Sequence, residues 1–130
     1  MVKKVYLEWS EIHELVNILC KKIITEYPII DSVMGLPRGG LIPAVWLSHS
    51  IGLPLVDTIG KNTLVVDDMT DSGVTMNKMP GQWTAVLFHK PHTSVFTPNV
   101  YSKLHEGDEW LVFPWEETDA PAIQDYLKNE

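Results

Sequence analysis

The sequence holds a single cysteine, Cys20, so no disulfide bond can form within the chain. It lacks an apolar run of 18 residues and a signal-peptide pattern, and we therefore expect a cytoplasmic protein with no membrane-bound part. Basic residues are scarce, since 10 Lys and Arg stand against 17 Asp and Glu, and they form no large cluster. A net charge of −7 argues against a protein that binds nucleic acid or an acidic membrane surface.

The composition that remains is that of an ordinary globular domain, with 45% hydrophobic and 21% charged residues. A chain of 130 residues is expected to form one domain over residues 1–130. Such a domain buries roughly two-thirds of its unfolded surface, which is enough for one sheet with flanking helices. A phosphate ligand is compatible with the negative charge, because backbone amides and a few well-placed cations can hold it locally.

Apolar periodicity predicts alternating strands and helices over residues 1–90. The predicted helices cover residues 11–26, after Ser10 as N-cap, then 41–50 and 73–79. The predicted strands cover residues 29–36, 53–57, a run from residue 63 to the paired acids, and 82–89, with an edge strand or extended lead-in at 5–7. This order favours an α/β fold in which a mostly parallel, twisted sheet carries helices on both faces.

Residues 91–118 differ from the rest because they are rich in Pro, Thr, Asn, Gly and Trp and show weak periodicity. We expect them to form a small irregular hood with one strand at 110–113. A short helix at 120–128 is predicted to close the chain.

The stretch 63–76 is the clearest functional signal. An apolar, β-branched run ends in two adjacent carboxylates, Asp67 and Asp68, and a loop of small residues containing Gly73 follows. In an open α/β sheet, ligands bind at the carboxyl ends of the strands, and backbone N–H groups leading into a helix bind anions. The stretch therefore indicates acids for sugar hydroxyls or a metal, then a phosphate cradle. The plainer alternative is a polar strand end followed by a turn.

A second candidate anion loop lies at residues 35–40, after the first predicted strand of the sheet. Gly39 and Gly40 expose backbone N–H groups, and Arg38 offers a planar cation to phosphate oxygens. Alone, this loop is also compatible with a tight turn that carries an exposed arginine. Two such loops on neighbouring strands favour a ligand with two phosphate-bearing ends.

The first loop resembles the signature of the type I phosphoribosyltransferases, which bind 5-phosphoribosyl 1-pyrophosphate (PRPP). Asp71, before the Ser-Gly pair, resembles the 6-oxopurine branch of that family and by this resemblance is the acid/base that contacts purine N7. The resemblance implies that Asp67 and Asp68 contact the ribose hydroxyls, directly or through Mg²⁺. It also implies a site for the 5-phosphate in the loop itself, formed by Asp71, Ser72, Gly73, Val74 and Thr75.

The second loop resembles the pyrophosphate loop of the same family. By this resemblance Pro37, Arg38 and Gly39 bind pyrophosphate, and the Pro37–Arg38 peptide bond is expected to be cis although Arg38 is not a proline.

The C-terminal part resembles the bacterial xanthine-guanine phosphoribosyltransferases. The resemblance implies that Lys90 donates to the purine 6-oxo group, that Trp110 stacks on the purine ring, and that the Leu111 carbonyl reads the 2-position. Glu116 stands where the family has an acid near a second metal. Stacking and a cation at the oxo group also make physical sense for a purine. The implied partners are PRPP and a purine base or nucleotide, in a homodimer or homotetramer.

Other aromatic and histidine residues have simpler interpretations. Core packing is the usual fate of tryptophan, and we expect it for Trp46, Trp83 and Trp115. His89 and His92 have a spacing that suits metal ligands, but we favour ordinary polar loop residues.

The chain departs from the family between its second and third predicted strands. The family has a long flexible loop there that closes over the site, whereas residues 58–62 form only a short link. The site is then open, or is covered by residues 92–100 or a neighbouring subunit, or binds its ligand without turnover. The favoured hypothesis is a purine phosphoribosyltransferase. The alternatives are a non-catalytic PRPP or nucleotide sensor and, with less support, a phosphoacceptor domain that uses Asp67 and Asp68.

Overall fold

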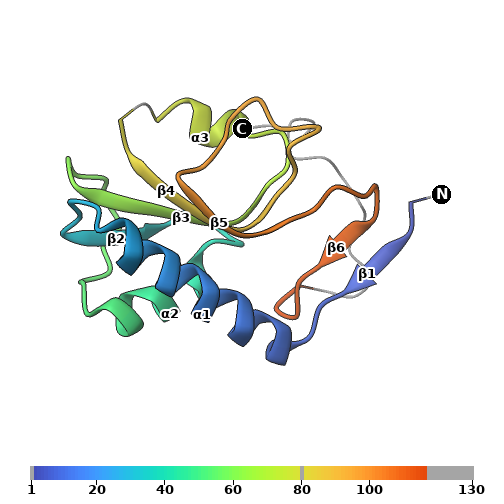
Figure 1. Cartoon of the computed structure of the whole chain (residues 1–130), viewed down its shortest axis with the longest axis horizontal. Helices are drawn as coiled ribbons and strands as arrows, with labels where there is room; N and C mark the ends of the chain where they lie inside the picture. Colours follow the sequence, from blue (N-terminus) through green and yellow to red (C-terminus); the bar gives the residue numbers. More distant parts are fainter. Residues whose placement is uncertain (1, 80, 117–130) are drawn as a thin grey trace.

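The computed structural model describes residues 2–79 and 81–116. A four-stranded sheet forms its centre, and every neighbouring pair of strands in it runs parallel, as the sequence predicts (Figure 1). Its strands, in spatial order, are β2 (Ser32–Gly35), β3 (Thr63–Thr70), β4 (Trp83–His89) and β5 (Val100–Leu104). The predicted helix at 120–128 lies outside the described residues.

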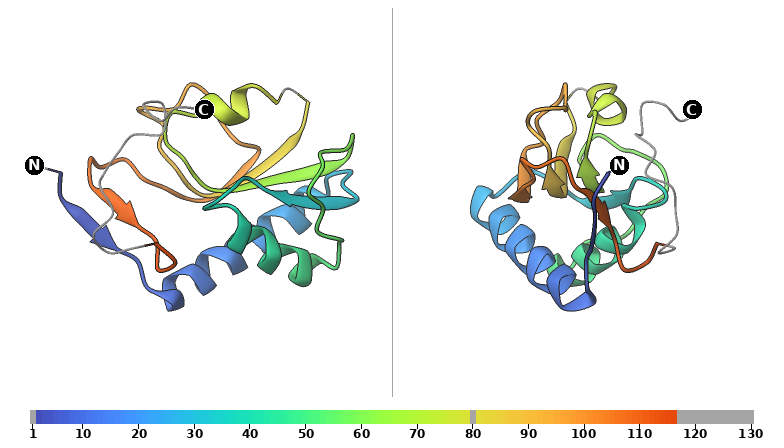
Figure 2. Two further views of the ribbon diagram at one scale, coloured as in Figure 1. Left: turned by 180° about the vertical axis from the view of Figure 1, so that it is seen from behind. Right: turned by 90° about the vertical axis from the view of Figure 1, so that its right-hand side faces the viewer.

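Helices cover both faces of this sheet, which confirms the predicted class of fold (Figure 2). The helices are α1 (Trp9–Glu26), α2 (Leu41–Ile51) and the short α3 (Val74–Asn77). Leu64 and Val66 of β3 belong to the core cluster under α1 and α2. Val65 lies in a second cluster with Met76 of α3 on the opposite face. Strands apolar on both faces suit this two-sided cover.

The boundaries of α1 follow from its end residues. The helix begins at Trp9, two residues before the predicted start, and the Glu8 backbone N–H donates to the Glu11 carboxylate over 3.2 Å. The helix ends at Glu26, and its C-cap Tyr27 adopts a left-handed conformation with φ of 55°, just before Pro28. Ser10 is therefore inside the first turn and is not the N-cap.

The predicted strand at 53–57 is wrong. This segment forms one isolated bridge, Val33 to Leu55, beside the edge strand β2. Pro54 has no backbone N–H to donate, so the ladder cannot continue. Pro54 instead accepts a hydrogen bond from Val33 over 2.9 Å.

The strand β5 was not predicted, and the core therefore does not end at residue 90. β5 joins the edge of the main sheet beside β4, within the segment expected to be an irregular hood. Only Val100 of its five residues is fully buried, so the segment carries little apolar periodicity.

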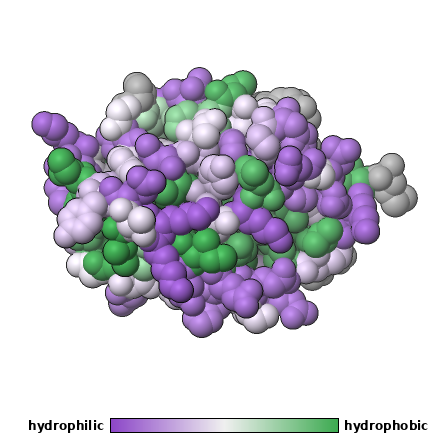
Figure 3. Space-filling model, viewed as in Figure 1, coloured by the Kyte–Doolittle hydropathy of each residue, from purple (hydrophilic) through white to green (hydrophobic). Residues whose placement is uncertain are grey.

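The hood itself is a separate two-stranded parallel sheet at one end of the molecule (Figure 1). It pairs β1 (Lys4–Tyr6) with β6 (Trp110–Val112), so both the predicted edge strand and the predicted hood strand exist. The face of the molecule in Figure 3 is largely hydrophilic, with separate apolar patches. Within residues 2–79 and 81–116, no helix combines the length and apolarity needed to cross a membrane.

Candidate active site

The candidate phosphate loop follows the carboxyl end of β3. Asp71, Ser72 and Gly73 are buried, and Gly73 adopts a left-handed conformation with φ of 75°. A Cβ atom on Gly73 would collide with the Ser94 hydroxyl and the backbone of Phe96, so glycine is required both by conformation and by space. Val74 and Thr75 then begin α3 and are exposed to solvent.

The chain after β4 fixes this loop from outside. The Val95 backbone N–H donates to the Ser72 carbonyl over 2.7 Å, and the Thr93 hydroxyl donates to the Asp71 carbonyl over 2.7 Å. The same hydroxyl lies 3.3 Å from the Asp71 carboxylate. These contacts tie the candidate phosphate loop to the segment that follows β4.

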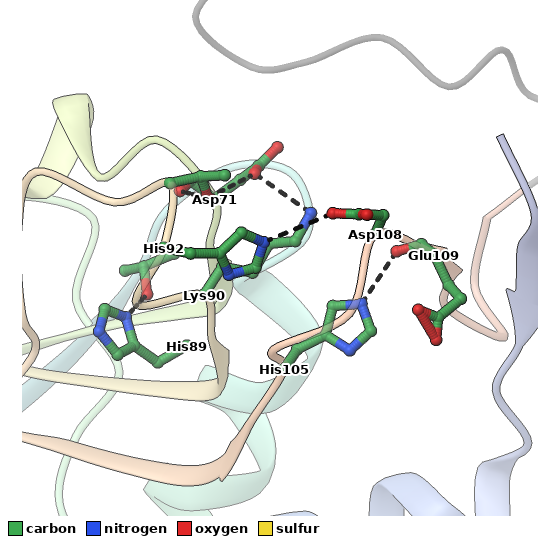
Figure 4. A network of polar contacts seen from close by, with 9 residues as sticks. Asp71, His89, Lys90, His92, His105, Asp108 and Glu109 are labelled. Carbon is green, nitrogen blue, oxygen red and sulfur yellow. Dashed lines mark hydrogen bonds and ion pairs between the residues drawn. The ribbon is translucent and has the colours of Figure 1, made fainter.

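Asp71 and Lys90 form a buried ion pair at the carboxyl ends of β3 and β4 (Figure 4). Lys90 Nζ lies 3.4 Å from Asp71 Oδ1, and the two side chains are only 6% and 8% exposed. The predicted acid/base and the predicted purine-binding cation thus meet, although 19 positions separate them in sequence. The backbone N–H of Lys90 also donates to the Thr70 carbonyl over 3.1 Å, which fixes the two strand ends.

Asp67 and Asp68 lie near the end of β3 and turn toward the backbone. Asp67 Oδ1 accepts from the Asp68 N–H, and Asp68 Oδ1 accepts from the Met69 N–H, both over 2.8 Å. Burial raises the pKa of Asp68 to about 6, and the negative charge of Glu116 adds to this. Asp68 therefore sits where a bound cation or a ligand hydroxyl would relieve an unfavourable charge.

The second loop packs directly against these acids. Leu36 N–H donates to the Val66 carbonyl over 2.8 Å, and the Pro37–Arg38 peptide bond is cis, as the family resemblance implies. A Cβ atom on Gly39 would collide with the Asp68 carboxylate, so the loop backbone and this acid share one surface. Arg38 is exposed beside it. The two predicted anion loops therefore flank the acids of β3.

The hood residues come from a different sheet. Trp110 is half-buried on β6, and its backbone N–H donates to the backbone carbonyl of Lys3 over 2.8 Å. Val112 accepts from Leu7 over 2.9 Å, so the alternate residue Leu111 directs its backbone N–H and carbonyl away from β1. The Leu111 carbonyl is therefore not used in the β1–β6 pairing, and its contact with a purine stays a prediction.

The loops around Lys90 and before Trp110 also approach each other. His92 Nε2 lies 3.9 Å from the Asp108 carboxylate, and His105 Nε2 shares a 2.9 Å hydrogen bond with the Glu109 carbonyl (Figure 4). His92 is exposed, which agrees with a polar loop residue. The prediction for His89 is wrong, because His89 is a buried residue at the end of β4.

Trp115 has the predicted packing role. Its ring stacks on Phe113 with centroids 5.0 Å apart and lies 5.9 Å from Trp9. Trp46 and Trp83 likewise pack, partly buried, against the main core cluster.

The predicted metal ligands are not gathered into one cluster. Glu116 Oε1 accepts from the Phe113 N–H over 2.8 Å. Among residues 2–79 and 81–116, no three His, Cys, Asp or Glu side chains are placed to hold a metal ion. Mg²⁺ commonly needs only one or two protein carboxylates and takes its other ligands from phosphate and water. The oxygen donors of Asp67 and Asp68 fit that mode.

Two residues near the site were missed at the level of sequence. Thr93 contacts Asp71, and Thr70 shares a hydrogen bond with His89. Polar residues at the ends of two apolar strands can be recognised in the sequence as candidates for a site. Which of them contact each other depends on the register between β3 and β4, which the sequence does not show.

Comparisons with known proteins agree with this geometry. No family model matches the chain. The xanthine-guanine phosphoribosyltransferase of Gluconobacter oxydans is 25% identical over 138 residues, which cover 83% of this chain and 82% of that protein. The crystal structure of a purine phosphoribosyltransferase from Pyrococcus horikoshii is 30% identical with a TM-score of 0.74, covering 93% of this chain and 98% of that one. A Neisseria gonorrhoeae protein solved with bound ppGpp shares the fold at 21% identity and a TM-score of 0.76, over 92% of both chains.

A parallel sheet with two loops of this kind at its carboxyl edge defines a type I phosphoribosyltransferase fold. The chain belongs to the phosphoribosyltransferase family, and it is similar to members of that family that act on purines.

Proposed function

We propose that this protein transfers ribose 5-phosphate from PRPP to a 6-oxopurine base, namely guanine, xanthine or hypoxanthine, and releases pyrophosphate. This reaction salvages purines. The observation that carries the proposal is the buried Asp71–Lys90 pair, which joins the candidate phosphate loop after β3 to the residue that follows β4.

The pair suits one edge of a 6-oxopurine. O6 and N7 are neighbouring polar atoms on the same edge of the ring system. Lys90 donates to O6 and stabilises the negative charge that grows there, while Asp71 faces N7. The two side chains contact each other over 3.4 Å, so the base replaces an existing contact with two new ones.

In the proposed step, the bond between the anomeric carbon and pyrophosphate breaks, and its electron pair leaves with the pyrophosphate. The lone pair of a purine ring nitrogen forms the new bond to that carbon, and the proton of N7 passes to Asp71. The exposed Arg38 guanidinium and the backbone of Pro37 and Gly39 bind the departing pyrophosphate.

Mg²⁺ is part of the proposal. Asp67 and Asp68 would hold it, the negative charge of Glu116 near Asp68 would favour its binding, and it would neutralise charge on the ribose hydroxyls and the pyrophosphate. The raised pKa of Asp68 supports this assignment, because a nearby cation would stabilise the ionised form.

The proposal is tested by following pyrophosphate release from PRPP with each base in turn, with and without EDTA. We expect release that requires both a 6-oxopurine and Mg²⁺. Equal release of pyrophosphate with adenine would contradict the proposed 6-oxopurine substrate. Release that persists in EDTA would contradict the requirement for Mg²⁺.

A second candidate is a nucleotide or PRPP sensor with the same cradle but without turnover. Two observations favour it: the short link at residues 58–62 in place of a closing loop, and the related fold that was solved with bound ppGpp. Nucleotide binding without any nucleotide product would support the sensor over the enzyme.

Self-association and location complete the proposal. We propose a homodimer or homotetramer in the cytoplasm. The helix α2 supports self-association, since it has no Asp, Glu, Lys or Arg and leaves Leu41 and Val45 43% and 42% exposed. Analytical ultracentrifugation of the wild type and of Val45→Glu tests this, and a monomeric wild type would exclude it.

A further inference from the structure

A buried histidine stands at the end of β4, outside the roles assigned above. His89 is 4% exposed, and its Nδ1 shares a 2.5 Å hydrogen bond with the hydroxyl of Thr70, which is 3% exposed. The His89 ring lies against Tyr101, with centroids 5.3 Å apart. Burial lowers the pKa of His89, so the imidazole is neutral near pH 7.

The position of this contact connects it to the site. Thr70 and His89 are partners at the last register position of β3 and β4. The residue after each is one half of the ion pair, Asp71 on β3 and Lys90 on β4 (Figure 4). The side-chain bond and the Lys90 N–H to Thr70 carbonyl bond thus join the two strands at the base of the pair.

The polar pair lies at the ends of two strands whose interiors are apolar. The strand interiors are apolar at Val65, Val66, Val86 and Leu87, and a β-branched apolar residue would fit the same strand positions without burying a hydroxyl and an imidazole. What the pair provides is a directional contact, which fixes the relative position of two strand ends more tightly than apolar packing does.

We propose that the Thr70–His89 hydrogen bond is a positioning device that sets the spacing between the Asp71 carboxylate and the Lys90 ammonium for the edge of the purine. The inference rests on the proposed function. Thr70 and His89 touch no reacting atom and act only through their neighbours. The phosphate loop is anchored separately by Ser72 and Gly73 against residues 94–96, so PRPP binding does not depend on this bond.

The test compares Thr70→Val, which keeps the shape but removes the hydroxyl, with Thr70→Ser, which keeps the hydroxyl. Thr84→Val is the matched control, because Thr84 is a fully buried threonine of β4 whose hydroxyl bonds to Asn99 far from the site. Each variant is assayed for kcat, for KM of guanine and of PRPP, and for Tm.

We expect Thr70→Val to lower kcat by roughly 10- to 100-fold, as a misplacement on the ångström scale does, and to raise KM for guanine. KM for PRPP should stay within about twofold, and Thr70→Ser should restore most of the activity. Thr84→Val should lower Tm without this change in kinetics. Wild-type kinetics in Thr70→Val, or equal losses in Thr84→Val, would overturn the proposal.

Binding separates this inference from the proposed function. If the wild type forms no nucleotide, the transfer reaction is refuted, and calorimetry with GMP and with ribose 5-phosphate then tests the positioning role alone. Thr70→Val should weaken binding of GMP by about tenfold, because it moves the Lys90 ammonium away from O6, and should leave binding of ribose 5-phosphate unchanged. Equal affinities of Thr70→Val and wild type for GMP, or a wild type that does not bind GMP, would overturn it.

Discussion

At the scale of single residues, the proposed transfer depends on Asp71. Its carboxylate is buried, paired with Lys90 and held by Thr93, so its environment is built before a ligand binds. A side chain fixed in this way is suited to transfer a proton at a defined atom.

Replacing Asp71 by Asn should lower kcat by about 100-fold or more, because the amide cannot take the proton. GMP binding should change little, since the phosphate loop and the hood remain. Steady-state kinetics and calorimetry measure the two effects. Asp31→Asn, at an exposed position before β2, is the control for the chemical change. Unchanged turnover in Asp71→Asn would exclude the acid/base role.

Asp68 predicts a dependence of stability on pH. Burial raises its folded pKa from 3.8 to about 6, so the folded protein keeps a proton that the unfolded chain loses. The stability from this group is fully present below about pH 4 and is lost as pH rises through 6. Asp68→Asn should therefore raise Tm at pH 8 and have almost no effect at pH 4, as calorimetry can measure. A variant less stable than the wild type at pH 8 would contradict this origin of the shift.

At the scale of elements, local motifs were predictable and long-range pairings were not. The loops after β2 and β3 depend on residues adjacent in sequence, such as Asp67 to Thr75, and their place at the ends of these strands was predicted correctly. β5 shows only Val100 as a buried residue, so its membership of the main sheet depends on pairing with β4. The predicted strand at 53–57 failed because Pro54 interrupts the ladder. His89 was predicted to be a polar loop residue, but it is buried. Its burial depends on its partner Thr70, which lies on another strand.

Two tryptophans near β6 have different predicted roles: Trp110, at the start of the strand, contacts the ligand, and Trp115, after its end, packs in the core. Trp110→Ala should raise KM for the purine by about 5- to 150-fold, the loss of one stacking contact, with KM for PRPP nearly unchanged. Trp115→Ala should instead lower the free energy of unfolding by about 2 kcal/mol, because its ring packs on Phe113 and Trp9. Kinetics and urea unfolding of both variants distinguish these roles. Equal loss of affinity for purine and PRPP in Trp110→Ala would make Trp110 a packing residue.

At the scale of the whole molecule, three separate parts of the chain converge on one edge of the sheet. The loop with Arg38, the loop after β3 and the segment after β4 contact each other through Asp68, Gly39, Ser72 and Val95. Sequence reasoning placed each part at a strand end but could not place Asp71 and Lys90 3.4 Å apart, because that distance is set by the register of β3 and β4. In the proposed function these three parts bind two phosphates and a base, and the short link at residues 58–62 makes turnover the property to measure.

A single-turnover experiment with enzyme in excess answers that question most directly. Radiolabelled guanine, xanthine and hypoxanthine are each mixed with PRPP, Mg²⁺ and a molar excess of the protein, and the product is separated by chromatography. If the protein catalyses the transfer, at least one base is converted to its nucleoside monophosphate, and one pyrophosphate is released per nucleotide. The Asp71→Asn variant should not carry out this conversion. Stable binding of PRPP or nucleotide with no nucleotide formed from any of the three bases would contradict the proposed transfer.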